Sequence, residues 1–135
     1  MRVVLDTSTL IAAHISRAGV CSELFEEILL HHELVVSEYI LAELERKLRD
    51  QFGFPDADVH AVSRFLRANA ELVDPDVLPA STGRDPEDLP ILGTAIAAGA
   101  AFLITVDRDL LDLVEFRGFA VIKPGEYWQR VEPLE

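Results

Sequence analysis

Short apolar runs recur along this chain, and a stretch with helical character separates each run from the next. The clearest runs cover residues 2–5, 34–36, 102–105 and 119–122, with a briefer one at 72–73. Runs this short and rich in β-branched residues predict buried strands. Because strands that alternate with helices form parallel sheets covered on both faces, the sequence predicts a three-layer α/β/α fold. We expect a central parallel sheet of four to five strands.

The segments between these runs carry signals for where helices start and stop. Ser22 and Ser37 can cap helices that reach about residue 32 and residue 50, and Gly99 can end a helix over residues 89–98. Further helices are expected at 9–16, 56–70 and 108–114, a loop at 74–87, and a final turn from Pro124. The length of 135 residues and the lack of a linker predict a single domain over residues 1–135.

Composition narrows the class of protein. Half of the residues are hydrophobic and mean hydropathy is +0.21, so a substantial core is expected and disorder is not. No apolar run approaches the ~20 residues of a membrane span, and Asp6 interrupts what would be the apolar part of a signal peptide. Cys21 is the single cysteine and cannot form an internal disulfide, which fits a cytoplasmic protein.

Four acids stand at positions that such a fold would bring together. Asp6 and Asp107 each follow a predicted strand, Asp88 opens a predicted helix, and Glu43 lies inside another. Ligands bind beyond the carboxyl ends of parallel strands, so Asp6 and Asp107 are expected at one edge. Because gathered carboxylates repel one another unless a cation lies between them, the pattern favours a Mg²⁺ or Mn²⁺ site.

Each acid also has a structural explanation. Asp6, Asp88 and Asp107 precede helices, and Asp is a favoured N-cap worth about 1 kcal/mol. At about 100° per residue, Glu43 falls about 60° outside the apolar stripe of its helix. A solvated side chain and a carboxylate reaching over the sheet edge both fit that position, so the spacing leaves the two open.

The order of these acids and their neighbours resembles the PIN domain. The stretches that carry the resemblance are residues 3–8, 35–37 with 41–44, 85–92 and 103–109, and it covers nearly the whole chain. The sequence is most similar to VapC-like PIN proteins, which are the toxin components of type II toxin–antitoxin systems. The resemblance therefore implies a PIN-like nuclease domain over residues 1–135 that cleaves RNA with Mg²⁺ or Mn²⁺.

The same resemblance assigns residues and partners. It implies that Asp6, Glu43, Asp88 and Asp107 are the catalytic, metal-binding acids, with Asp85 and Asp109 as near alternatives. Thr7, Ser8 and Thr105 would support these acids, and Ser8 stands where this branch commonly has asparagine. The implied partners are an RNA substrate and a cognate antitoxin, expected to lie across residues 38–65, with a homodimer as a further arrangement and no membrane.

The charge of the chain leaves alternatives open. Its net charge is −12, the wrong sign for a nucleic-acid binder, which allows a PIN fold that binds a partner without cleaving RNA. Arg46, Lys47 and Arg49 form a basic run, either a solvated helix face or a set of RNA contacts. A phosphoacceptor receiver domain shares the α/β pattern but needs an acidic pair where Thr7 and Ser8 follow Asp6. Tyr127 and Trp128 are expected to pack on the core or on a dimer interface rather than on bases.

Overall fold

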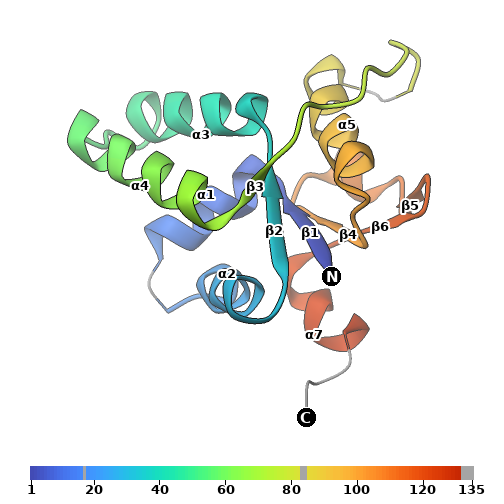
Figure 1. Ribbon diagram of the computed structural model, residues 1–135, viewed down its shortest axis with the longest axis horizontal. Helices are drawn as coiled ribbons and strands as arrows, with labels where there is room; N and C mark the ends of the chain where they lie inside the picture. Colours follow the sequence, from blue (N-terminus) through green and yellow to red (C-terminus); the bar gives the residue numbers. More distant parts are fainter. Residues whose placement is uncertain (17, 83–84, 132–135) are drawn as a thin grey trace.

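The elements of the fold alternate between strands and helices, as the sequence predicts. The computed structural model describes residues 1–16, 18–82 and 85–131 (Figure 1). The strands are β1 (Arg2–Leu5), β2 (Glu33–Val36), β3 (Glu71–Leu72), β4 (Phe102–Ile104), β5 (Glu115–Phe116) and β6 (Phe119–Ile122). The α-helices are α1 (Thr7–Ile15), α2 (Val20–His31), α3 (Glu38–Asp50), α4 (Asp56–Asn69), α5 (Leu89–Ala98), α6 (Arg108–Leu111) and α7 (Tyr127–Arg130). The described residues also include the 3₁₀ turns η1 (Pro86–Asp88) and η2 (Pro124–Glu126).

The described strands form one sheet in the order β3-β2-β1-β4-β6-β5. All neighbours pair in parallel except β5, which runs antiparallel to β6. The expected parallel sheet is therefore present, and β5 adds an antiparallel edge strand. The predicted helix over 108–114 stops at Leu111, because Val114 has a φ of 60° and the chain turns into β5.

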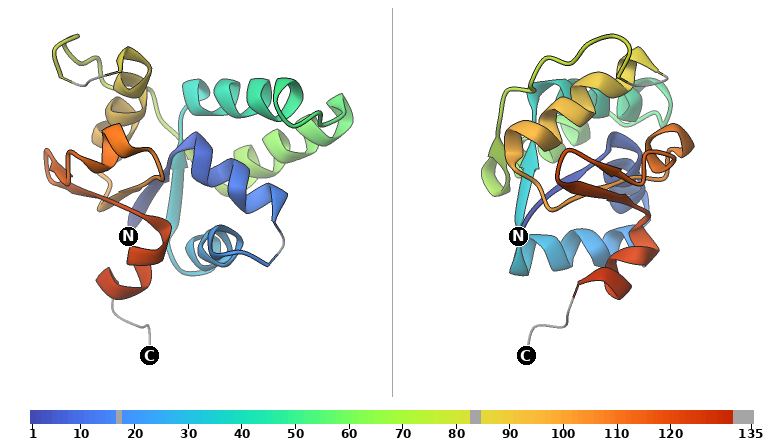
Figure 2. Two further views of the ribbon diagram at one scale, coloured as in Figure 1. Left: turned by 180° about the vertical axis from the view of Figure 1, so that it is seen from behind. Right: turned by 90° about the vertical axis from the view of Figure 1, so that its right-hand side faces the viewer.

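Helices cover both faces of the sheet. Helix α5 contacts β1, β2 and β4, whereas α1 and α2 lie on the opposite side (Figure 2). The paired helices α3 and α4 extend to one side of the sheet (Figure 1). The middle strands β1 and β4 are buried nearly throughout, which explains their continuous apolar sequences.

Local capping follows the sequence at α3 but not at α2. The Ser37 hydroxyl accepts a hydrogen bond from the Ile40 amide, as predicted for an N-cap. The prediction that Ser22 caps α2 is wrong, since α2 begins at Val20 after Gly19. The Ser22 hydroxyl instead donates to the carbonyl oxygens of Ala13, at 2.9 Å, and Ser16. It therefore ties the end of α1 to the start of α2.

The loop that follows β3 is fastened to α5. The Asp76 amide donates to the Gly93 carbonyl at 3.0 Å, and a side chain on Gly93 would collide with the Asp76 backbone. Residues 83–84 of the predicted loop lie outside the described residues.

None of the described helices has the length and apolarity needed to cross a membrane. At the other end of the chain, Tyr127 is buried as expected, and Trp128 is 46% exposed.

Candidate metal and catalytic site

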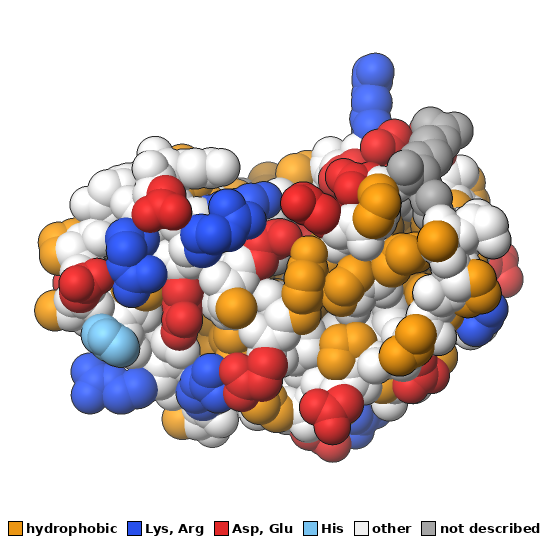
Figure 3. Space-filling model, turned by 90° about the horizontal axis from the view of Figure 1, so that it is seen from above, with side chains coloured by type: hydrophobic (Ala, Val, Ile, Leu, Met, Phe, Trp, Pro, Cys, Tyr) orange, Lys and Arg blue, Asp and Glu red, His pale blue; other side chains and the backbone are white. Residues whose placement is uncertain are grey.

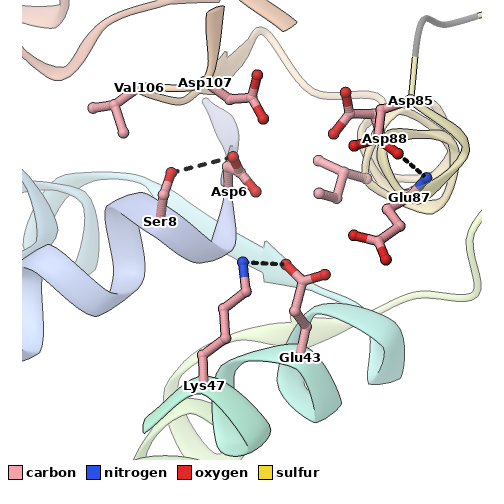
Figure 4. A pocket seen from close by; sticks show the side chains of 10 residues that line it. Asp6, Ser8, Glu43, Lys47, Asp85, Glu87, Asp88, Val106 and Asp107 are labelled. Carbon is pink, nitrogen blue, oxygen red and sulfur yellow. Dashed lines mark hydrogen bonds and ion pairs between the residues drawn. The ribbon is translucent and has the colours of Figure 1, made fainter. Parts of the chain in front are cut away.

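The acids predicted from the sequence meet in one pocket at the carboxyl ends of β1 and β4. The pocket has a volume of about 340 Å³ (Figure 4). Among the described residues, six with carboxylate side chains line it (Asp6, Glu43, Asp85, Glu87, Asp88 and Asp107), together with Ser8, Lys47, Ile91 and Val106. The strand register that pairs Leu5 with Ile104 sets the first and last of these acids side by side.

Asp6 is the most firmly held of the acids. Its amide donates to the Ile104 carbonyl at 2.9 Å, which joins the ends of β1 and β4. Its carboxylate accepts hydrogen bonds from the Thr7 amide at 2.6 Å, the Thr105 hydroxyl at 2.7 Å and the Ser8 hydroxyl at 3.2 Å. Burial raises the pKa of Asp6, the three hydrogen bonds oppose that rise, and the nearby charge of Glu43 adds to it.

Thr105 connects Asp6 to Asp107. Its hydroxyl donates to Asp6 and accepts a hydrogen bond from the Asp107 amide at 2.9 Å. The Asp107 carboxylate in turn accepts from the Asp109 amide at 2.8 Å and caps α6. Asp6 and Asp107 therefore each cap a helix and also line the shared pocket, so the two explanations do not exclude each other.

Asp85 and Asp88 play different structural parts. The Asp85 carboxylate accepts a hydrogen bond from the Glu87 amide at 3.0 Å and thereby caps η1. The Asp88 side chain is buried, and within the described chain it makes no capping hydrogen bond to α5. Burial, followed by the charges of Asp107 and other neighbouring carboxylates, raises the pKa of Asp88 to about 7. Both acids line the pocket; Asp85 also caps η1, whereas the Asp88 side chain caps no helix among the described residues.

Glu43 faces the pocket rather than solvent. Its side chain is only 10% exposed, and its Oε1 atom lies 3.6 Å from Lys47 Nζ one turn further along α3. Figure 4 shows both side chains entering the pocket from α3, opposite the acids of β1, β4 and η1. The alternative of a solvated flank does not hold for this residue.

The donor set fits a hard divalent cation. Carboxylate oxygens of Asp88, Asp107 and Asp109 all lie within 4.8 Å of one another. Asp109 lines an adjoining pocket of about 280 Å³ with Ser81 and Thr82, so it borders the main pocket instead of lining it. Asp6 and Glu43 line the main pocket but lie outside this close group. Burial and then the neighbouring carboxylate charges raise the pKa of Asp88, and crowded oxygen ligands of this kind are the environment that Mg²⁺ or Mn²⁺ stabilises.

The three predicted RNA contacts differ in position. Lys47 lines the main pocket, and Arg46 lines a neighbouring pocket of about 220 Å³ beside Tyr39 and Glu87. Arg49 instead pairs with Asp56 at 2.8 Å, and its side chain is 44% exposed. Sequence reasoning singled out neither Glu87 nor Tyr39. Only the presence of Glu87 inside the Asp85–Asp88 turn could have indicated it.

Comparison with known proteins gives the same fold. The crystal structure of VapBC2 from Rickettsia felis bound to a DNA fragment from their promoter superposes with a TM-score of 0.65 at 16% identity, covering 91% of this chain and 98% of that one. The crystal structure of PAE2754 from Pyrobaculum aerophilum superposes with a TM-score of 0.65 at 18% identity, covering 96% and 88%. No curated protein sequence matches this chain. A model of the PIN domain matches residues 2–109, most of the chain, and argues against the receiver-domain alternative. The chain therefore belongs to the PIN-domain family.

Proposed function

We propose that this protein is a metal-dependent endoribonuclease and the toxin of a toxin–antitoxin pair. The observation that carries the proposal is the meeting of Asp6, Glu43, Asp88 and Asp107 in one pocket at the strand ends. PIN-family membership supports a nuclease, and VapBC2 from Rickettsia felis supports the toxin–antitoxin setting as a structural relative.

Each residue has a defined task in this proposal. Asp6, Glu43, Asp88 and Asp107 would hold a Mg²⁺ or Mn²⁺ ion, with Asp109 close enough to take part. Such an ion would neutralise phosphate charge and lower the pKa of an attacking water. Thr105 and Ser8 fix the orientation of the Asp6 carboxylate, so that its oxygens are in place before a ligand arrives.

An apolar surface beside the acids suits a protein partner. A hollow of about 410 Å³ lies there. The described residues that line it are mostly apolar: Tyr39, Pro75, Val77, Leu78, Pro86, Leu89 and Pro90, together with Asp76. Val77 is 97% exposed, which is unusual for an apolar side chain in a small domain. Figure 3 shows hydrophobic side chains gathered next to acidic ones on this side. We propose that an antitoxin covers this surface. Of the range 38–65 expected from the sequence, only Tyr39 lines this hollow, and the other described lining residues belong to the loop after β3, to η1 and to the start of α5.

The test is cleavage of a structured RNA by the purified protein. EDTA should abolish cleavage, and Mg²⁺ or Mn²⁺ should restore it with products that end in 5′-phosphate and 3′-hydroxyl groups. Asp6→Asn and Asp107→Asn should lower kcat by at least about 100-fold. Undiminished cleavage in EDTA would contradict the metal site. No cleavage under any condition, with retained partner binding, would favour the non-cleaving interaction module.

A further inference from the structure

A lysine side chain lies inside the acidic pocket. Among the described residues, Lys47 is the only Lys or Arg that lines it, against six carboxylate side chains. Its Nζ atom lies 3.6 Å from Glu43 Oε1, and the Lys47 and Glu43 side chains are 29% and 10% exposed. The pair is therefore partly shielded from water, where a charge interaction is stronger than on an open surface.

The position of Lys47 puts it in competition with a metal ion. Glu43 is one of the acids that would hold the ion, so the ammonium group and the ion would both approach the same carboxylate. Two cations near one carboxylate repel each other, and the long flexible stem of lysine lets its ammonium group move away. A phosphate group brought to the ion would then offer Lys47 a new anion close by.

We propose that Lys47 exchanges anions during the reaction cycle. It neutralises Glu43 in the metal-free protein, and it contacts the substrate phosphate when a divalent ion occupies the acids. This inference rests on the proposed nuclease function. The neighbouring arginine Arg49 does not fit the role, since Asp56 holds it on the outer side of α3.

The two halves of the exchange predict opposite effects of one substitution. Lys47→Met keeps the stem and removes the charge, so Mg²⁺ should bind about three- to tenfold more tightly. At saturating Mg²⁺, kcat/KM for RNA should fall about 10- to 100-fold, because a phosphate contact is lost. In EDTA the variant should melt at a lower temperature, since Glu43 then lies in the pocket with no ammonium group beside it.

The experiment combines calorimetric Mg²⁺ titration with RNA cleavage for wild type, Lys47→Met, Lys47→Gln and Lys47→Arg. The control is Arg117→Met, which changes net charge equally in the turn between β5 and β6, and the strand order puts β5 at the edge of the sheet away from β2, which precedes α3. Arg117→Met should leave both readouts within about twofold. Lys47→Gln should behave as Lys47→Met, and Lys47→Arg should recover cleavage at least partly.

Two results would overturn the inference while leaving the proposed function intact. One is Mg²⁺ binding by Lys47→Met and Lys47→Gln that is unchanged or weaker than in wild type. The other is a kcat/KM of these variants equal to that of wild type, when wild-type cleavage itself requires metal. A wild-type protein that neither binds Mg²⁺ or Mn²⁺ nor cleaves RNA would instead remove the proposed function, and the role of Lys47 with it.

Discussion

At the scale of single residues, one buried hydroxyl organises two of the acids. Thr105 is fully buried, donates to Asp6 and accepts from the Asp107 amide. An acidic site needs such groups because carboxylates that repel one another do not hold a fixed arrangement unaided. Thr105 therefore links the end of β4 to the acid at the end of β1.

Replacing this hydroxyl tests how much the support contributes. Thr105→Val keeps the shape and leaves the buried Asp6 carboxylate with one hydrogen bond fewer, so Mg²⁺ affinity should fall about 10- to 100-fold. The free energy of unfolding should drop by about 1–3 kcal/mol. Thr105→Ser retains the hydroxyl and is the matched control. Equal Mg²⁺ affinity in Thr105→Val and wild type would mean that the hydroxyl does not position the ligand.

The raised pKa of Asp88 predicts how the free energy of unfolding depends on pH in EDTA. Its pKa is about 7 in the folded protein, against 3.8 as its ordinary value. The folded state therefore binds this proton more tightly than the unfolded chain, and the stabilisation is fully present below pH 3.8. It is lost as pH rises through 7.

Urea unfolding between pH 5 and pH 8 measures this effect. The midpoint of wild type should fall across the range, and Asp88→Asn should flatten the fall. Asp58→Asn, at an exposed position on α4, should keep the wild-type slope. A wild-type midpoint that rises with pH would contradict a pKa of Asp88 raised by burial and by the neighbouring acids.

At the scale of elements, the contact between the loop after β3 and α5 decides where η1 sits. The hydrogen bond from Asp76 to Gly93 brings two backbones together at a place where no side chain fits. Because η1, which includes Asp88, directly precedes α5, we expect this contact also to fix the positions of Asp88 and Ile91 in the main pocket.

Gly93→Ala should therefore destabilise the protein by about 1–3 kcal/mol through overpacking. The helical propensity of alanine would otherwise favour this change by about 1 kcal/mol, so a net loss reports the collision. Gly125→Ala in η2 is the matched control, since a side chain there meets nothing within 4 Å. A Gly93→Ala variant as stable as wild type in urea would show that the loop yields without cost.

The same elements show what the sequence predicts well. Helices α3 and α5 and strands β1 and β6 have the predicted bounds, because caps, Gly99 and continuous apolar runs mark their ends. Strand β5 has two residues and no periodic signal, so it could not be predicted. The start of α2 was misplaced because Ser22 bonds to carbonyls of α1, a contact that spacing does not reveal.

At the scale of the molecule, parallel topology explains why the acids could be predicted together. Two acids that follow adjacent parallel strands must share an edge, and the β1–β4 register places them there. The sequence could not show that Lys47 and Glu87 line the same pocket. The spacing within α3 did not decide whether its charged side chains point to solvent or to the sheet edge, and η1 lies far from α3 along the chain. The net charge was equally uninformative, because −12 is a property of the whole chain and does not show that basic side chains such as Arg46 and Lys47 lie beside the pocket.

If these acids share one divalent metal site, added Mg²⁺ must stabilise the folded protein, and urea unfolding measures that gain. Wild type should gain stability from Mg²⁺, by about 2.7 kcal/mol at 100 times its Kd. Asp6→Asn should gain far less from Mg²⁺ than wild type, because one ligand of the ion is lost. In EDTA the substitution removes a buried charge but also an acceptor of the Thr105 and Ser8 hydrogen bonds, so the two effects on stability oppose each other. If wild type gains no stability from Mg²⁺ or Mn²⁺, the shared metal site is contradicted.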